Sequence, residues 1–211
     1  PPPLPPPGGA PRFTEDELCP PWDDDDDDDD DDDGGLPTWV EGDSLAPYLG
    51  TPADFLDAAL RFAAVDPRDV VTDVGCGDGR LPTMAVAKFG ASRGRGLELE
   101  ADLVGRARTL AARRGVAHRV SFYECDVTAP LHPDVQRALD ETTLLVMYLL
   151  PEALDRVRPL ITRHLRATGI DRRVLCLGWA PKDLAPTRAT ALTFPNGAGM
   201  DIALLDAASL P

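Results

Sequence analysis

From Val70 onward, short apolar segments alternate with longer segments in which apolar residues recur every three or four positions. A short apolar run is typical of a buried strand, and the longer spacing is typical of a helix with one buried face. The apolar runs predict five strands, at residues 70–74, 95–99, 120–125, 144–150 and 173–177. This alternation predicts an α/β fold with a parallel sheet, in which ligands bind at the carboxyl ends of the strands.

Helical patterns precede and separate these strands. The first helix is predicted to begin near Thr51 as its N-cap, with Pro52 at the first helical position and Asp54 in a capping box. The last helix opens at Pro151 and contains Pro159, where we expect a kink because proline donates no helical hydrogen bond. Two further helices are expected at residues 81–89 and 103–111.

The C-terminal part departs from this alternation. Residues 189–194 and 200–205 flank a Pro-Asn-Gly-Ala-Gly segment. Two apolar runs around such a turn are typical of an antiparallel hairpin. We therefore expect a mostly parallel sheet, covered by helices on both faces, that finishes in an antiparallel hairpin.

The first 35 residues differ in composition from the rest of the chain. They are proline-rich at the start and then contain eleven consecutive aspartates, Asp23–Asp33. Such a segment buries too little apolar surface to offset its loss of entropy on ordering. We predict a disordered tail over residues 1–35 and one folded domain over residues 36–211. The tail is either a solvated linker or a docking segment for a basic partner or an aromatic groove.

The charge balance bears on the partners of the chain. Its net charge is −15, but the tail holds fourteen acidic residues against one arginine, which leaves −2 for the remaining residues. Phosphate binding requires clustered positive charge, so we expect no nucleic-acid partner. No apolar run approaches the roughly 18 residues of a spanning helix, so no membrane segment is expected.

The four cysteines and three histidines are scattered, without a Cys-x-x-Cys pair. This pattern disfavours a metal site and a disulfide framework, and it favours a reducing compartment. We therefore expect an intracellular protein, cytoplasmic or organellar. The sequence begins at Pro1 without an initiator methionine, so we expect the true N-terminus to lie upstream.

The segment from Asp73 to Gly79 carries the strongest chemical signal. An acidic residue near the end of the first strand precedes Gly75, Gly77 and Gly79, and a helix follows. Glycines let the backbone take positive φ and approach a ligand closely. Asp73 and Asp78 would repel a pyrophosphate, whereas they attract a ligand that carries ammonium and sulfonium charges. The loop therefore predicts a cationic cofactor rather than a dinucleotide.

Two more acidic residues stand at the ends of the next two strands. Glu98 follows Gly79 by 19 residues, close to the offset of about 20 at which an acidic residue meets a ribose diol. Glu100 is the alternative, although its surroundings favour it as the start of the next helix. Asp126 can accept a hydrogen bond from the exocyclic amine of an adenine. Together with Asp73, these residues predict a nucleoside site.

Over roughly residues 46–206 the sequence resembles the class I, seven-strand S-adenosylmethionine-dependent methyltransferases. The segment Asp73–Gly79 is similar to the first motif of that family. The resemblance implies that Glu98 binds the ribose and Asp126 binds the adenine of S-adenosyl-L-methionine. It also implies a Rossmann-like seven-stranded sheet of order 3-2-1-4-5-7-6, with the last strand antiparallel.

A closer resemblance is to the protein lysine methyltransferases that modify the c-subunit of ATP synthase and the adenine nucleotide translocase, together with their bacterial relatives. It is carried by Tyr-Leu-Gly-Thr-Pro at residues 48–52, Gly-Asp-Gly-Arg at 77–80 and Val-Met-Tyr-Leu-Leu-Pro at 146–151. The resemblance implies methyl transfer to a protein lysine.

Methyl transfer is an in-line displacement, so the protein mainly has to hold the acceptor behind the methyl carbon. Tyr148, at the end of the fourth strand, is our candidate catalytic residue, orienting the acceptor amine; an ordinary rim tyrosine is the alternative. Tyr48 and Thr51 are candidates to close over the methionine end of the cofactor, although capping alone explains Thr51. The Asn-Pro-Pro-Tyr tetrapeptide used on amide and nucleobase nitrogens is absent.

We therefore predict an enzyme that moves a methyl group from S-adenosylmethionine to a protein lysine, with a Lys-rich protein as a suitable substrate. A small-molecule methyltransferase and a non-catalytic S-adenosylmethionine-binding interaction protein are the competing hypotheses.

Overall fold

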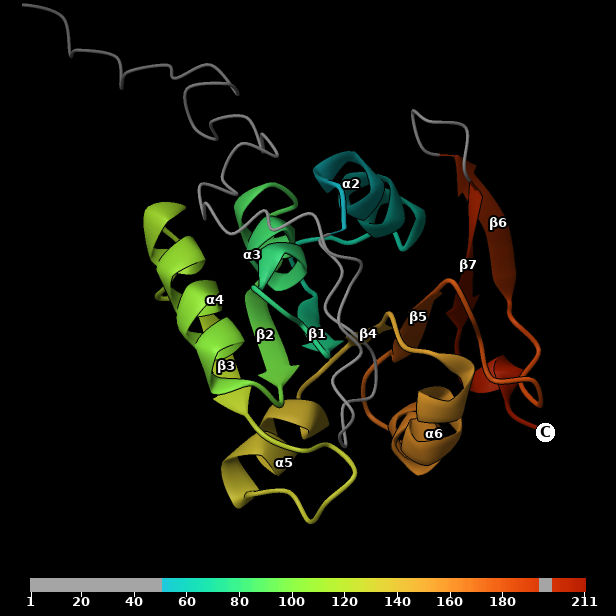
Figure 1. Ribbon diagram of the computed structural model, residues 1–211. Helices are drawn as coiled ribbons and strands as arrows, with labels where there is room; N and C mark the ends of the chain where they lie inside the picture. Colours follow the sequence, from blue (N-terminus) through green and yellow to red (C-terminus); the bar gives the residue numbers. More distant parts are fainter. Residues whose placement is uncertain (1–50, 194–198) are drawn as a thin grey trace, which may run out of the picture.

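The computed structural model describes residues 51–193 and 199–211. Among these residues, seven strands form one sheet in the order β3-β2-β1-β4-β5-β7-β6 (Figure 1). Strands β1 to β5 pair in parallel, and β7 runs antiparallel to both β5 and β6. The strands are β1 (Val70–Val74), β2 (Arg93–Glu98), β3 (Val120–Glu124), β4 (Leu144–Met147), β5 (Arg173–Leu177), β6 (Arg188–Thr193) and β7 (Gly199–Leu205).

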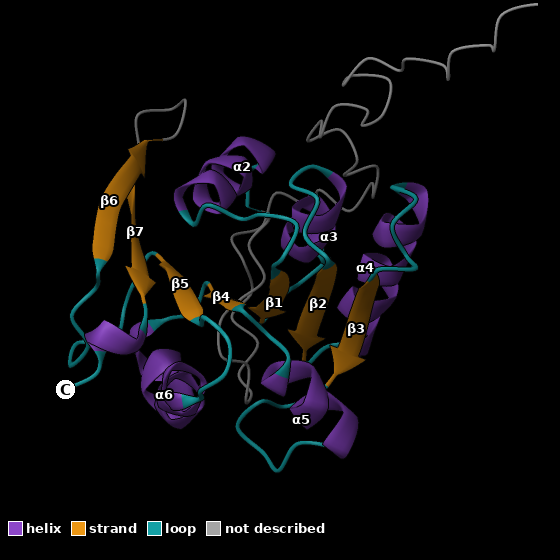
Figure 2. Cartoon of the chain, turned by 180° about the vertical axis from the view of Figure 1, so that it is seen from behind, coloured by secondary structure: helices purple, strands orange, loops and turns teal. Residues whose placement is uncertain are grey.

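This arrangement confirms the predicted Rossmann-like α/β fold, its strand order and its C-terminal hairpin. Helices cover both faces of the sheet (Figures 1 and 2). On one face lie α2 (Ala53–Phe62), α3 (Arg80–Ala87) and α4 (Ala101–Arg113); on the other lie α5 (Pro133–Asp140) and α6 (Pro151–Arg166). Each face has its own cluster of buried apolar side chains, because the strands contribute residues alternately to the two sides. A short 3₁₀ helix, η2 (Ala207–Ser209), follows β7.

The start of α2 differs from the prediction. The helix begins at Ala53, with Pro52 in the N-cap position and no side-chain cap. Pro52 has an extended ψ of 140°, which places Thr51 outside the cap position. The assignments of Thr51 as N-cap and of Asp54 to a capping box are therefore wrong. The expected tail and Tyr48 lie outside the described residues.

Helix α5 is an element that the sequence analysis missed. Two short sequence signals were available: Pro133 opens the helix, and Val135, Ala138 and Leu139 follow at helical spacing on its buried face. Nδ1 of His132, at the N-cap, accepts a hydrogen bond from the Asp134 N–H at 3.3 Å. Helix α6 continues through Pro159 as one helix. Buried Val157 and Ile161, on either side of that proline, belong to the core beneath the helix.

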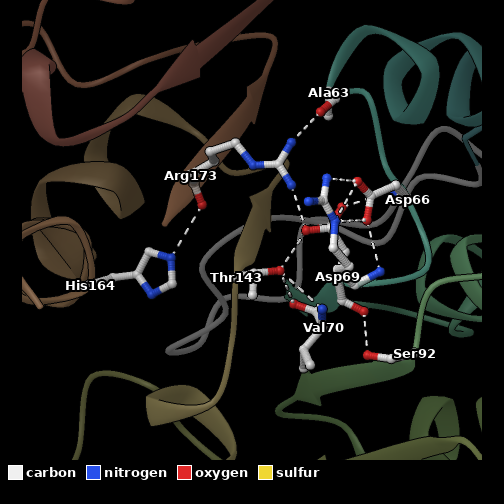
Figure 3. A network of polar contacts seen from close by, with 9 residues as sticks. Ala63, Asp66, Asp69, Val70, Ser92, Thr143, His164 and Arg173 are labelled. Atoms are coloured by element: carbon white, nitrogen blue, oxygen red, sulfur yellow. Dashed lines mark hydrogen bonds and ion pairs between the residues drawn. The ribbon is translucent and has the colours of Figure 1, made fainter. Parts of the chain in front are cut away.

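A buried ion pair joins the amino ends of the central strands (Figure 3). Asp69, which precedes β1 and is 5% exposed, accepts hydrogen bonds from Arg173 of β5 at 2.5 Å and from the Thr143 hydroxyl, next to β4, at 2.7 Å. The Asp66 N–H donates to the other carboxylate oxygen. Removing one partner of such a pair leaves an uncompensated buried charge, so this network holds the three strand starts together.

Close approaches between glycines and bulky side chains position the loop after β1. A Cβ on Gly96 of β2 would collide with Sγ of Cys76 and would lie 2.6 Å from Cδ1 of Phe122. A Cβ on Gly79 would lie 2.5 Å from Cε1 of the same phenylalanine. Real Cβ atoms do not come so close, so these two positions exclude any side chain.

We expect Gly96→Ala to lower the free energy of unfolding by about 1–3 kcal/mol, because the added methyl group overpacks a filled site. Gly105→Ala is the matched control. Gly105 lies in α4 with open space around its Cα, so the same change should raise stability by about 0.5–1 kcal/mol through helix propensity. Urea denaturation of both variants measures the difference. Equal stabilities would contradict the proposed close packing.

Candidate active site at the carboxyl edge of the sheet

A pocket opens at the carboxyl ends of β1 to β5, where the strand order reverses between β1 and β4. This edge is the usual ligand position in open α/β sheets. The cavity has a volume of about 170 Å³. Predicted site residues that line it are Thr51, Asp73, Gly75, Gly77, Glu98, Asp126 and Tyr148. Gly79 does not line the pocket and instead packs beneath the loop.

The loop after β1 turns through three glycines in the left-handed region. Gly75, Gly77 and Gly79 have φ values of 76°, 55° and 79°. The Gly75 N–H donates to the Leu97 carbonyl of β2 at 2.8 Å, which fastens the loop across the neighbouring strand. Because Gly75 and Gly77 carry no side chain, the backbone itself forms that wall of the pocket.

Glu98 is held by three backbone N–H groups. Its Oε2 accepts from Gly77 at 2.8 Å, and its Oε1 accepts from Leu99 at 2.7 Å and from Glu100 at 3.2 Å. A carboxylate has about four acceptor positions, so capacity remains for a ligand hydroxyl. Glu100 occupies the N-cap position of α4, as expected, and also lines the pocket.

Asp126 follows β3 and is oriented by a local turn. Its Oδ1 accepts hydrogen bonds from the N–H and from the hydroxyl of Thr128, both at 2.7 Å. These bonds hold the pKa of the carboxyl below its usual value, so it is ionised near neutral pH. Both Thr128 bonds go to Oδ1, so Oδ2 has capacity to accept from a ligand amine.

Asp73 is buried without a counter-charge among the described residues. It is 7% exposed, and no described residue donates a hydrogen bond to its carboxylate or forms an ion pair with it. Burial raises its pKa well above the usual value, and the charges of Glu98 and Asp78 raise it further. A cation bound beside Asp73 would relieve this repulsion.

Asp78 is compensated from within the loop. Arg80 Nε lies 2.8 Å from Asp78 Oδ2, and the two side chains are only 14% and 20% exposed. The pair lies largely buried at the pocket, because α3 begins at Arg80 directly behind the loop. Asp78 thus has a counter-charge, whereas Asp73 has none within residues 51–193 and 199–211.

Two aromatic side chains also line the pocket. Tyr148 directly follows β4, is half-buried, and has its pKa raised by burial, so the phenol keeps its proton. Gly178 makes room for its ring, since a Cβ there would lie 3.2 Å from Tyr148 Cε2. Trp179, the next residue, lines the same pocket and is 45% exposed.

Trp179 and Leu99 were missed in the sequence analysis. Both are large exposed apolar side chains, and both lie on the pocket. Trp179 could have been predicted from its position, because it follows the fifth strand much as Tyr148 follows the fourth.

The cysteines near the pocket are not suited to nucleophilic chemistry. Burial raises the pKa of Cys76, and it raises the pKa of Cys125 to about 11, so both are thiols at neutral pH. In residues 51–193 and 199–211, no group of three His, Cys, Asp or Glu side chains is placed to hold a metal ion. The same ranges contain no helix with both the length and the apolar character needed to cross a bilayer.

Comparison with known proteins decides the family. The model of the ANTKMT methyltransferase domain matches residues 73–188, which run from the acidic end of β1 to the start of β6. The chain belongs to this methyltransferase family. A protein-lysine N-methyltransferase from Saccharolobus islandicus (strain REY15A) is 27% identical over 145 residues, which are 65% of this chain and 83% of the relative.

Two further relatives of this methyltransferase differ in the acceptors that their names state. An RNA methyltransferase from Salinibacter ruber, solved in complex with S-adenosyl-L-homocysteine, is 32% identical, with a TM-score of 0.63 and coverage of 75% of this chain and 94% of that one. A probable chloroplastic tocopherol O-methyltransferase from Oryza sativa subsp. japonica is 27% identical over 153 residues, which are 70% of this chain and 40% of the relative.

The pocket fits the cofactor of an S-adenosylmethionine-dependent methyltransferase, which is what this chain is. The unpaired carboxylate of Asp73 suits the positive groups of the methionine end. The side-chain-free loop admits close approach of the ligand, and the open Oδ2 of Asp126 suits an adenine amine. These residue roles stay predictions, which binding measurements can test.

We expect Asp73→Asn to stabilise the free protein near pH 8. The pKa of Asp73 is raised above its usual value of 3.8, so above that pH the folded chain holds more protons than the unfolded chain. Stability therefore falls as the pH rises through the raised pKa, and asparagine lacks this penalty. Urea denaturation should show the advantage of the variant shrinking toward pH 5. An advantage independent of pH would contradict the assignment.

The same variant should bind S-adenosylmethionine about ten times more weakly or worse, because the cation loses its counter-charge. Calorimetric titration measures this loss. Stabilisation of the protein without weaker binding would place the cation away from Asp73.

We expect Glu98→Ala to weaken S-adenosylmethionine binding by about 1.5–3 kcal/mol, the range for a hydrogen bond to a charged group. Glu100→Ala, at the N-cap of α4, is the matched control and should change binding by less than about threefold. Calorimetry of both variants at one pH separates the two carboxylates. A larger loss in the control would assign the ribose to Glu100.

Proposed function

We propose that the chain transfers the methyl group of S-adenosylmethionine to a lysine side chain of a protein. The observation that carries this proposal is the charge of the pocket. Among the described residues it is lined by five carboxylates (Asp73, Asp78, Glu98, Glu100 and Asp126) and one guanidinium, Arg80, which is paired with Asp78. Such a lining attracts a lysine ammonium and repels a phosphate backbone.

The chemistry needs little acid–base machinery. S-adenosylmethionine supplies an electrophilic methyl group on a sulfonium sulfur. Asp73, Glu98 and Asp126 hold and orient that cofactor, while the rim presents the acceptor nitrogen in line with the methyl carbon. A lysine, with an unperturbed pKa of about 10.4, has to lose a proton first, and desolvation in the pocket favours this loss.

Tyr148 is the residue placed to orient the acceptor. Its phenol keeps its proton, and its oxygen can accept a hydrogen bond from the incoming amine. Trp179 lines the same pocket and is partly exposed, so its indole face can attract an ammonium group as it enters. Both residues follow neighbouring parallel strands, so the acceptor enters between the ends of β4 and β5.

A second candidate is transfer to RNA, because the Salinibacter ruber relative of that name shares 32% identity over 94% of its length. The acidic pocket favours lysine over this candidate, since its carboxylates repel phosphates.

The test is transfer of labelled methyl groups from S-adenosylmethionine into a cell lysate, divided into protein, RNA and small-molecule fractions. We expect protease-sensitive label that appears as methyl-lysine on amino-acid analysis. RNase-sensitive label would overturn the lysine proposal in favour of RNA. Label in the small-molecule fraction would indicate a small-molecule methyltransferase, and cofactor binding without any transfer would indicate a non-catalytic binding protein.

We expect Tyr148→Phe to lower the rate of transfer at least tenfold while changing S-adenosylmethionine affinity less than about twofold, because only acceptor orientation is lost. Single-turnover kinetics and calorimetry measure the two effects. Trp179→Leu should mainly raise KM for the acceptor. Equal losses of rate and cofactor affinity in Tyr148→Phe would contradict acceptor positioning.

A further inference from the structure

The net charge of the domain is small, but its basic residues are concentrated in two segments that contain no acidic residue. Residues 79–97 and 103–123 contain no aspartate or glutamate but nine arginines and lysines. Three of these cations form ion pairs with acidic residues outside the two segments or at their border: Arg80 with Asp78, Lys88 with Asp57, and Arg95 with Glu141. We call the surface formed by the other six the basic face. They are Arg93, Arg108, Arg113 and Arg119, together with Arg106 and Arg114, which have interaction partners of their own.

These six arginines come from one side of the molecule. Helix α4 and the edge strand β3 lie at the end of the sheet opposite the β6–β7 hairpin (Figure 1). Arg106 and Arg113 are seven residues apart in α4, so they project on the same side of the helix. The Arg119 carbonyl accepts from the Gly94 N–H at 3.0 Å, which places Arg93 beside Arg119.

Much of the charge of this face is not balanced by the described residues. Arg93, Arg108 and Arg113 are exposed, and neither they nor half-buried Arg119 forms an ion pair with any described residue. Attraction to the carboxyl end of α4 accounts for Arg113 and Arg114. It does not account for Arg93 or Arg119, which stand at the starts of strands.

The chain carries a segment of matching charge. Asp23–Asp33 are eleven consecutive carboxylates, and seventeen residues separate them from Thr51, the first described residue. Seventeen residues reach at most about 60 Å, at roughly 3.3–3.6 Å per residue. A domain of this size is about 40 Å across, so the aspartates can reach the basic face from Thr51.

We propose that Asp23–Asp33 docks on the basic face of its own domain. Tethering gives the segment an effective concentration in the millimolar range, which favours it over acidic partners from solution. An uncovered basic face would bind phosphate backbones without sequence preference. The docked segment therefore screens the domain from nucleic acids and leaves the acidic pocket edge open to a basic protein.

The first test compares the full chain with a full-length variant in which Asp23 to Asp33 are all asparagine. In amide NMR spectra at low salt, the resonances of Arg93, Arg113 and Arg119 should shift between the two proteins. The difference should vanish near 0.5 M salt, where charges are screened within a few ångströms. Identical spectra, or shifts spread evenly over all arginines, would overturn the proposal.

The second test measures binding of a fluorescent single-stranded RNA, used as a polyanion probe, at low salt. The all-asparagine variant should bind it at least tenfold more tightly than the wild type, and adding Arg93→Gln, Arg113→Gln and Arg119→Gln should abolish the gain. The matched control adds Arg137→Gln, Arg166→Gln and Lys182→Gln, exposed cations outside the face, and should keep the gain. Equal RNA binding by the wild type and the all-asparagine variant would show that the aspartates do not occupy the face and would overturn the proposal.

Discussion

The close approach of the glycine loop to β2 and β3 is the constraint on which the pocket depends. The side chains of Cys76 and Phe122 fill the space that a Cβ on Gly96 would need, and Phe122 also fills the space beside Gly79. Only this packing lets the loop cross the end of β2 and donate from Gly77 to Glu98. The side-chain-free wall of the pocket and the fixed position of Glu98 are thus two consequences of one steric arrangement.

Acidic and basic side chains are concentrated in different regions of this protein. Five carboxylates gather at the pocket, while six arginines gather along α4 and the starts of β2 and β3. A net value of −2 for residues 36–211 averages two regions of opposite sign. The expectation of no nucleic-acid partner was drawn from that average and stays a prediction. Carboxylates gathered at the pocket attract a cationic ligand, and arginines gathered on the basic face attract an anionic one.

The fold supports several acceptors, so the rim of the pocket has to distinguish between them. Relatives at about 30% identity are named for a protein lysine, an RNA and a tocopherol. The carboxylates of the pocket suit a cationic cofactor and also disfavour a phosphate backbone. Tyr148 and Trp179 follow β4 and β5 and line the pocket, and our proposal places the acceptor beside them.

The sequence by itself determined the order of strands and helices along the chain, the hairpin and the acidic strand ends, because hydrophobic periodicity and glycine spacing are local signals. The order of the strands within the sheet was implied only by the family resemblance. Local signals led to a wrong prediction at Thr51, because α2 begins one residue later, with Pro52 as its N-cap. They did not lead to a prediction of α5. Tertiary structure alone decided that Gly79 serves packing while Gly75 and Gly77 face the pocket, that Trp179 joins Tyr148, and that Arg93 lies beside Arg119. These outcomes depend on which strands become neighbours, a property of long-range pairing that no single segment carries.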